Sequence, residues 1–347
     1  MSLGAIRQIA LRFRNRFRSK ALILLYHRTS EVETDPQLLS VTPKHFSDHL
    51  AHLVKRYSVM SLDELVCARL ARRDIPDRTI AVTFDDGYAD NLTEAMPLLE
   101  RFNVPATVFV AGLAFDDQPF WWDELESIFL RPSTLPSAFN LRVGSVDCRR
   151  ELNSAAQYRE AEFARYRNWD VLNPDAPTPR HALYRDLCVM LKQASPSQRS
   201  AAMRTIREWS GRSNTRYRGH RRLTAREIKD LASGYVVRVG AHTVSHAALA
   251  TLSLQEQRKE IFDSRDDLEK ILGEAPKSFA YPFGCKTDYS SDTVSLVRSA
   301  GFELACSNYP GIVTAGVDKY QLPRMIVRNW SQDIFATKVN SWFEEGV

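Results

Sequence analysis

The chain has 347 residues, of which 44% are hydrophobic and 26% charged, proportions that are typical of a globular protein and exclude an intrinsically disordered chain. The formal net charge of +5 comes from residues 1–20, which hold six basic residues and no acidic one, so the remainder carries a net charge of −1. A nearly neutral body excludes a general affinity for nucleic acid.

Residues 1–20 form a basic tail, in which a short helix over residues 4–18 could lie on an anionic membrane surface, where each basic residue contributes about 1 kcal/mol. The alternative, slightly favoured, is a solvated terminus. Arginines interrupt the apolar core that a signal peptide needs, and no apolar run is long enough to span a bilayer. The five cysteines are scattered without a Cys-x-x-Cys pair, which indicates a reducing compartment. We therefore expect a cytoplasmic protein, with peripheral contact to the inner membrane surface left open.

The next hundred residues predict alternating strands and helices. Ala21–Tyr26 is a continuous apolar run, typical of a strand buried on both faces, and it ends at His27. Further predicted strands cover residues 57–60, 80–83 and 106–110, while predicted helices begin after Thr42 and after Ser61 and span residues 91–102. This alternation implies parallel pairing and an α/β architecture.

The alternation stops between residues 113 and 220, which we predict to be a mainly helical insertion punctuated by prolines. Trp121 and Trp122 in this insertion could stack on a sugar ring, although burial is the more common fate of tryptophan. From residue 221 the pattern returns, with predicted strands at 235–240, 278–281, 302–306 and 325–327 and predicted helices after Thr224, after Ser253, over 292–300 and from Gln332. We therefore expect one split domain, residues 21–112 and 221–347, around the insertion.

Two carboxylates, Asp85 and Asp86, follow the predicted strand over residues 80–83. A turn and a site are equally good interpretations of this stretch alone, because Asp-Gly is common turn chemistry. His242 and His246 are four residues apart, a spacing that places both imidazoles on one face of a helical turn. Two histidines and a carboxylate form a catalytic metal set that leaves a position open for water or substrate. The combination favours a site.

Three segments resemble motifs of the polysaccharide deacetylase family, also called the NodB-homology or carbohydrate esterase family 4 group. They are Thr-Phe-Asp-Asp-Gly at 83–87, His-Thr-Val-Ser-His at 242–246 and Phe-Ala-Tyr-Pro-Phe-Gly at 279–284. The resemblance covers residues 21–112 and 221–330. It implies a distorted, incomplete (β/α) barrel of NodB type, and a metal-dependent hydrolase that removes N-acetyl groups from amino sugars of a polysaccharide or glycolipid precursor.

The resemblance implies a role for each matched residue. Asp85 is similar to the general base that takes a proton from the attacking water, and the similar metal ligands are Asp86, His242 and His246. This division agrees with physical chemistry, because a carboxylate bound to a cation stays ionised and is a poor base. The backbone amide of Phe283 resembles the oxyanion donor, with a simple strand-ending turn as the alternative. The ligand set suits Zn²⁺, and Co²⁺ or Ni²⁺ fits it as well.

The sequence departs from the family pattern at two places. Many members carry a general-acid histidine near the C-terminus, where this chain has none. His27 resembles the acid of a subgroup with a permuted motif order, typified by exopolysaccharide N-deacetylases, and we favour it over His220; a structural role is the alternative. Ala280 replaces an arginine that is frequent in the family, and Arg324 could instead orient Asp85 from another strand, or be a surface residue.

The expected partners are N-acetylated glycans, glycolipids or sugar nucleotides, and a cytoplasmic location favours a lipid-linked or nucleotide-linked precursor. Two alternatives stay open. The chain could remove another acyl group, such as formyl, or hydrolyse a non-sugar amide. It could also be a catalytically silent glycan-binding protein, although binding alone needs no base beside a metal ligand. The sequence leaves the oligomeric state open.

Overall fold

The computed structural model describes residues 20–71, 73–112, 119–212, 220–314 and 316–345, so the predicted basic tail, apart from Lys20, lies outside the described residues. The chain divides into two compact units. The first comprises Met1–Glu31, Ser40–Ala114 and Leu223–Val347, and the second comprises Val32–Leu39 and Phe115–Arg222. No helix of the described part is long and apolar enough to cross a membrane.

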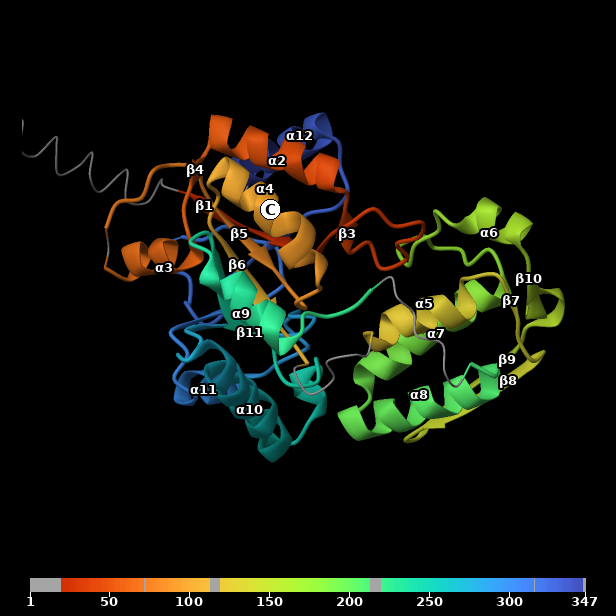
Figure 1. The fold of residues 1–347 in the computed structure, drawn as a ribbon. Coiled ribbons are helices and arrows are strands. Elements are labelled where there is room, and N and C mark those ends of the chain that lie inside the picture. Colours follow the sequence, from red (N-terminus) through yellow and green to blue (C-terminus); the bar gives the residue numbers. More distant parts are fainter. Residues whose placement is uncertain (1–19, 72, 113–118, 213–219, 315, 346–347) are drawn as a thin grey trace, which may run out of the picture. The chain divides into compact units, whose positions relative to one another are not determined.

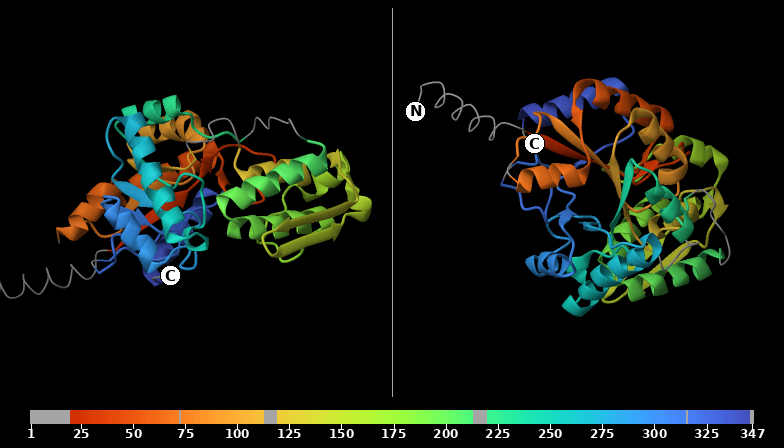
Figure 2. Two further views of the ribbon diagram at one scale, coloured as in Figure 1. Left: turned by 90° about the horizontal axis from the view of Figure 1, so that it is seen from below. Right: turned by 60° about the vertical axis from the view of Figure 1, so that its left-hand side comes forward.

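The first unit is built around an eight-stranded sheet, seen from several sides in Figures 1 and 2. Its strands are β1 (Ala21–Tyr26), β4 (Ser58–Val59), β5 (Thr79–Phe84), β6 (Ala106–Val110), β11 (Val237–Ala241), β12 (Ser278–Ala280), β13 (Leu304–Cys306) and β14 (Met325–Ile326). The order is β13-β12-β11-β6-β5-β1-β14, with β4 beside β5, and every pairing is parallel. Among the described strands β13 and β14 are the two edges, which confirms the predicted incomplete (β/α) barrel.

Strand β1 shows why this sheet forms. All six of its residues are fully buried, and it pairs with β5 along its whole length. Leu22 and Leu24 pack into one hydrophobic cluster together with helix side chains, whereas Ala21 and Ile23 pack into another. Because successive side chains of a strand point to opposite faces, a continuous apolar run satisfies a parallel sheet that is covered on both sides.

Helices connect the strands of the first unit. They are α2 (Pro43–Arg56), α3 (Leu62–Leu70), η1 (Asn91–Ala95), α4 (Met96–Phe102), α9 (Ala225–Ser233), η4 (Leu249–Thr251), α10 (Leu254–Leu272), α11 (Ser291–Ser299) and α12 (Gln332–Glu345), and a short parallel pair is formed by β2 (Arg28–Thr29) and β3 (Ser40–Val41). The predicted N-caps Thr42, Ser61, Thr224 and Ser253 each accept a hydrogen bond from the first turn of their helix.

The helix predicted over residues 91–102 differs from the expectation. Its first turn, η1, is a π-helix, in which the N–H of Met96 bonds to the carbonyl of Asn91. Pro97 follows and has no N–H for the carbonyl of Thr93, so a regular α-helical bond is unavailable there. A π-turn is rare and often lies beside a functional site.

The second unit has its own hydrophobic core. Its elements are α5 (Trp121–Phe129), β7 (Ser133–Thr134), β8 (Ala138–Val143), β9 (Val146–Glu151), η3 (Asn153–Ala156), β10 (Gln157–Tyr158), α6 (Glu160–Tyr166), α7 (Pro179–Gln193) and α8 (Pro196–Ser210). Strands β8 and β9 form an antiparallel hairpin, as do the shorter β7 and β10. Trp122 is buried and stacks on Phe120, with ring centroids 4.5 Å apart, so packing accounts for this tryptophan.

The described part of residues 113–220 is mainly helical, as predicted, but the prediction did not include two features of this unit. The first is the β8–β9 hairpin, in which Phe139, Leu141 and Val143 alternate with exposed residues and Gly144 adopts a positive φ in the turn. The prediction also omits Val32–Leu39, which belongs to this unit. That segment has no regular apolar pattern, and it is joined to the unit by polar contacts such as the bond from Val171 N to Pro36 O.

Candidate functional site

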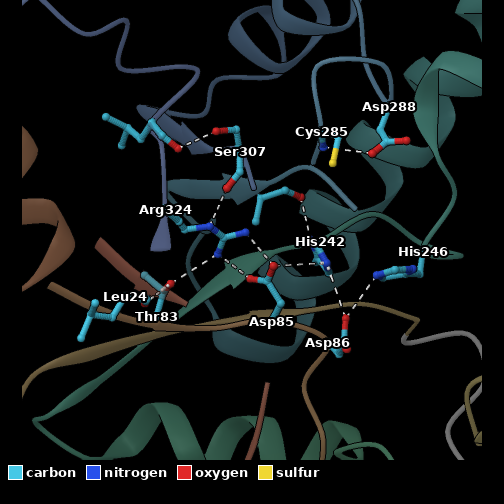
Figure 3. A network of polar contacts seen from close by, with 12 residues as sticks. Leu24, Thr83, Asp85, Asp86, His242, His246, Cys285, Asp288, Ser307 and Arg324 are labelled. Carbon is cyan, nitrogen blue, oxygen red and sulfur yellow. Dashed lines mark hydrogen bonds and ion pairs between the residues drawn. The ribbon is translucent and has the colours of Figure 1, made fainter. Parts of the chain in front are cut away.

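Several predicted site residues of the first unit lie in loops at the carboxyl ends of the sheet's strands. Asp85 and Asp86 directly follow β5, His27 follows β1, and His242 follows β11. In parallel strands the carboxyl ends share one edge, and there the loops that follow the strands bring polar side chains together. Figure 3 shows Asp85, Asp86, His242 and Arg324 around one point at this edge.

Asp86, His242 and His246 form a buried group of ligand atoms. The Oδ1 atom of Asp86 lies 3.2 Å from Nε2 of His246 and 3.6 Å from Nε2 of His242, and the ligand atoms of all three residues lie within 4.8 Å of one another. None of the three side chains is exposed. The residues predicted to bind a metal therefore converge.

The protonation of His242 tests whether the group fits a cation. Its Nδ1 lies 2.7 Å from the carbonyl oxygen of Ala280, which can only accept, so Nδ1 carries the proton. Burial lowers the pKa of His242 to about 4 despite the nearby carboxylates, so the ring is neutral at pH 7. Its Nε2 lone pair then faces a carboxylate oxygen, an arrangement that a cation between them stabilises. The donor set fits a divalent metal ion.

The histidines do not lie on a helical turn, so that part of the prediction was wrong. Residues 242–246 form a loop in which Thr243 and His246 have positive φ angles of 67° and 54°. The Thr243 hydroxyl accepts a hydrogen bond from the backbone N–H of His246 at 3.0 Å, which closes the loop locally. Asp86 also has a positive φ, 77°. Such strain in non-glycine residues is concentrated at functional sites.

Asp85 has different surroundings from its neighbour. Arg324 donates two parallel hydrogen bonds to its carboxylate, at 2.7 and 2.6 Å, and a third from Nε to the carbonyl of Ser307 at 2.7 Å. Burial raises the pKa of Asp85, but the Arg324 guanidinium, together with His242 and His27, outweighs burial and holds the pKa at about 2. Asp85 Oδ2 is 3.9 Å from Nε2 of His242, so this second carboxylate lies beside the ligand group.

His27 lies within the electrostatic reach of both carboxylates. Burial lowers the pKa of His27, while Asp86 and Asp85 act in the opposite direction. The side-chain amide of Asn91, in the π-turn η1, donates a hydrogen bond to the His27 carbonyl at 2.9 Å. The rival candidate, His220, belongs to the second unit, where its Nδ1 is 3.2 Å from a carboxylate oxygen of Asp123.

Phe283 lies next to the ligand group. Its ring meets the His246 ring edge to face, with centroids 4.8 Å apart, and its φ is 59°. The following residue, Gly284, also has a positive φ, and a Cβ there would lie 2.7 Å from the backbone nitrogen of Asn308. The turn therefore requires this glycine.

Two features were not found from the sequence. The carbonyl of Ser307 fixes Arg324, and a backbone acceptor leaves no signal in a sequence. A second group of potential ligands, Asp123, Glu126 and His220, lies in the second unit. There Asp123 pairs with His220, and Glu126 pairs with Arg131 at 3.3 Å.

Comparisons with known proteins point to one family. The family model described as polysaccharide deacetylase matches residues 72–135 and 205–305, ranges that contain both the Asp85–Asp86 pair and the histidine loop. Together with the relatives and solved structures below, this match supports a NodB-type polysaccharide deacetylase. Polysaccharide deacetylases are hydrolytic enzymes, which confirms the predicted enzyme class.

Individual members of this family are distant in sequence. YxkH, a Bacillus subtilis protein assigned to the polysaccharide deacetylases, is 18% identical over 311 residues, covering 89% of this chain and 72% of its own. The poly-beta-1,6-N-acetyl-D-glucosamine N-deacetylase of Escherichia coli is 27% identical over 82 residues, 23% of this chain and 12% of the relative.

Solved structures of deacetylases share the fold of this chain. The Streptococcus pyogenes deacetylase PplD, solved in complex with acetate, superposes with a TM-score of 0.57 at 17% identity, over 93% of this chain and 99% of that one. IcaB from Ammonifex degensii gives a TM-score of 0.53 at 15% identity, over 94% and 97% of the two chains. At these identities the likeness establishes the fold.

Proposed function

We propose that this chain is a metal-dependent hydrolase that removes N-acetyl groups from amino sugars of a glycan or glycan precursor. One observation carries the proposal: two adjacent buried carboxylates have separate partners. Asp86 faces two imidazole nitrogens, whereas Asp85 is held by Arg324. Carboxylates in different surroundings can take different roles in one reaction.

Asp86, His242 and His246 would hold the metal ion, which when bound supplies a Lewis acid that polarises the amide carbonyl. Two imidazoles and one carboxylate suit Zn²⁺, and Co²⁺ or Ni²⁺ can occupy the same set. The Nδ1–H bond from His242 to the Ala280 carbonyl supports this role, because it orients the ring and leaves Nε2 as the ligand atom.

Asp85 is the general base in this proposal. A carboxylate has about four lone-pair positions, so the two hydrogen bonds from Arg324 leave others for the attacking water. Arg324 fixes the carboxylate plane and keeps it ionised before the reaction. Asp85 then removes one proton from water as the water oxygen bonds to the acetyl carbon.

His27 is the proposed general acid. As the C–N bond breaks, the departing sugar nitrogen needs a proton, and His27 is a histidine outside the ligand set on whose pKa Asp86 and Asp85 both act. The products are acetate and a free amine. The backbone N–H of Phe283 is the proposed donor to the oxyanion, which its position beside His246 supports.

The substrate class follows from the family. The Escherichia coli relative is named for action on poly-beta-1,6-N-acetyl-D-glucosamine, and the chain shares 27% identity with it over 82 residues. We infer an N-acetylated polysaccharide or a lipid-linked or nucleotide-linked precursor of one as the substrate. A cytoplasmic location is part of this proposal, and the scattered cysteines support it.

Acetate release from a panel of N-acetylated oligosaccharides, glycolipids and sugar nucleotides tests the proposal. We expect release that stops with a chelator and returns with Zn²⁺. The Asp85→Asn variant, whose amide oxygen still accepts from Arg324, should bind the metal but lose turnover by about 10²- to 10⁴-fold. Asp86→Asn should lose the metal. Glycan binding without acetate release would identify a silent binding protein, and release of formate alone would identify another deacylase.

A further inference from the structure

Helix α10 carries a buried carboxylate that reaches the loop holding both ligand histidines. Glu260 accepts a hydrogen bond from the backbone N–H of Ser245 at 2.8 Å and another from the Ser245 hydroxyl at 2.7 Å. The Glu260 residue is only 8% exposed. Ser245 immediately precedes His246, so the two bonds act on the backbone that positions this histidine.

The loop needs such a restraint because its backbone is strained. Thr243 and His246 both have positive φ angles, which are unfavourable for residues other than glycine and persist only where the surroundings fix the conformation. His242 is fixed from the sheet, since its N–H bonds to the carbonyl of Val110 at 3.0 Å. At the far end of the loop, Glu260 supplies hydrogen bonds that are stronger than neutral ones because the acceptor is charged.

We propose that Glu260 is a positioning residue that holds the His242–His246 loop in its metal-binding geometry. It acts through Ser245 and touches neither substrate nor metal. The inference rests on the proposed metal site. It goes further because it predicts that a residue of helix α10 contributes to the affinity of that site for metal. Residues that orient metal ligands typically alter affinity by about 10- to 100-fold when they are removed.

Metal affinity is the readout, measured as the Zn²⁺ dissociation constant by competition with a chromophoric chelator. Glu260→Ala should weaken binding by about 10- to 100-fold. Glu260→Gln should weaken it less, because its amide oxygen accepts from the Ser245 N–H and its amide nitrogen donates to the Ser245 hydroxyl. Ser245→Ala removes one of the two bonds. Combining it with Glu260→Ala should add little, since both changes break the same contact.

Gln257→Ala is the matched control. Gln257 lies one turn earlier on α10, is equally buried, and bonds to the Leu252 carbonyl and the Thr293 hydroxyl, away from the histidine loop. It should lower the free energy of unfolding without changing the dissociation constant. If Glu260→Ala fails to fold, the Gln and Ser245→Ala variants carry the same comparison.

The outcomes separate this inference from the proposed function. Affinity equal to that of the Gln257→Ala control in all Glu260 and Ser245 variants would overturn the positioning role, as would a wild-type protein that binds no Zn²⁺. The wild-type protein could bind Zn²⁺ tightly but release no acetate, while the Glu260 variants bind Zn²⁺ more weakly. That result would overturn the deacetylase proposal and leave the positioning role intact.

Discussion

Arg324 and Asp85 face each other through two parallel hydrogen bonds, from Nη1 to Oδ1 at 2.7 Å and from Nη2 to Oδ2 at 2.6 Å. They are 239 residues apart in the chain, and both are almost completely buried. The pair joins the end of β5 to the start of β14, two strands that both neighbour β1. A bidentate arginine fixes the plane of a carboxylate as well as its charge.

Arg324→Lys tests this geometry. An ammonium cannot make two parallel bonds, so Asp85 should lose its fixed plane and kcat should fall by about 100-fold. The pKa of Asp85 should also rise, which moves the acid limb of the pH profile of kcat/KM to higher pH. Zn²⁺ affinity is the control and should stay unchanged, because Arg324 bonds to Asp85 rather than to the ligands. An unmoved acid limb would contradict the role of Arg324.

The same pair predicts a stability effect. The pKa of Asp85 is about 2 in the folded protein, below its ordinary value, so the pair stabilises the fold above pH 4, and this stabilisation is lost as pH falls from about 4 to 2. Arg324→Met leaves a buried charge without its partner and should lower the free energy of unfolding by about 3–5 kcal/mol in urea titrations at pH 7. Adding Asp85→Asn should restore much of that loss, whereas an additive loss would contradict the pairing.

His27→Gln tests the proposed general acid. Glutamine keeps a hydrogen-bonding side chain but cannot transfer a proton, so kcat should fall by about 10²- to 10⁴-fold with little change in Zn²⁺ affinity. Substrates with a better leaving group, such as acetylated anilines, need less protonation and should lose less activity. A uniform loss across leaving groups would assign His27 a structural role instead.

Gly240→Ala should destabilise the sheet beside the site. A Cβ at Gly240, in β11, would lie 2.5 Å from Cδ1 of Phe109 and 2.7 Å from Oγ of Ser278. Overpacking of this kind costs about 1–3 kcal/mol, measurable by urea unfolding. Gly316→Ala is the control, because nothing lies within 4 Å of its added Cβ, and it should change stability by less than about 0.5 kcal/mol. Equal changes in the free energy of unfolding for the two variants would show that Phe109 and Ser278 can move to accommodate the added methyl group.

His49 predicts an acid sensitivity. Its ring stacks on Phe335 with centroids 3.9 Å apart, and Nε2–H donates to the Trp330 carbonyl at 2.8 Å. Burial lowers the pKa of His49 to about 4, and the Trp330 bond only partly opposes this. Between pH 6.5 and 4 the unfolded chain therefore binds a proton that the folded protein does not, so stability falls as pH falls.

His49→Gln should reduce this pH dependence. The glutamine amide can still donate to the Trp330 carbonyl but does not titrate in this range. The slope of the free energy of unfolding against pH should shrink by about one proton between pH 6.5 and 4. An unchanged slope would mean that His49 is protonated in the folded protein at higher pH.

The sequence predicts the sheet and the convergence of the site residues better than it predicts the backbone conformation of the loops that carry them. Continuous apolar runs mark β1 and β5, and parallel strands bring Asp85, Asp86 and His242 to one edge whatever the details of packing. The loop around His246 could not be predicted, because its positive φ angles result from tertiary hydrogen bonds such as those of Glu260.

Short or polar segments were also not predicted from the sequence. The β8–β9 hairpin has an alternating pattern, but two of the six residues of β8 and four of the six residues of β9 are charged or polar, so the pattern resembles that of the neighbouring helices. Arg324 could be proposed as the partner of Asp85 from its position at a strand start, whereas the Ser307 carbonyl that anchors it depends on the backbone path alone.

The assignment of Val32–Leu39 to the second unit has a consequence for biosynthesis. Thr34 donates to Glu126, and Gln37 donates to the Tyr184 hydroxyl at 2.9 Å. Glu126 and Tyr184 are synthesised 92 and 147 residues after Thr34 and Gln37, respectively. Val32–Leu39 can therefore form these contacts only after the later helices of the second unit have been synthesised. A fragment spanning only residues 115–222 would lack both donors, so the insertion cannot be excised as one continuous piece without exposing its buried acceptors.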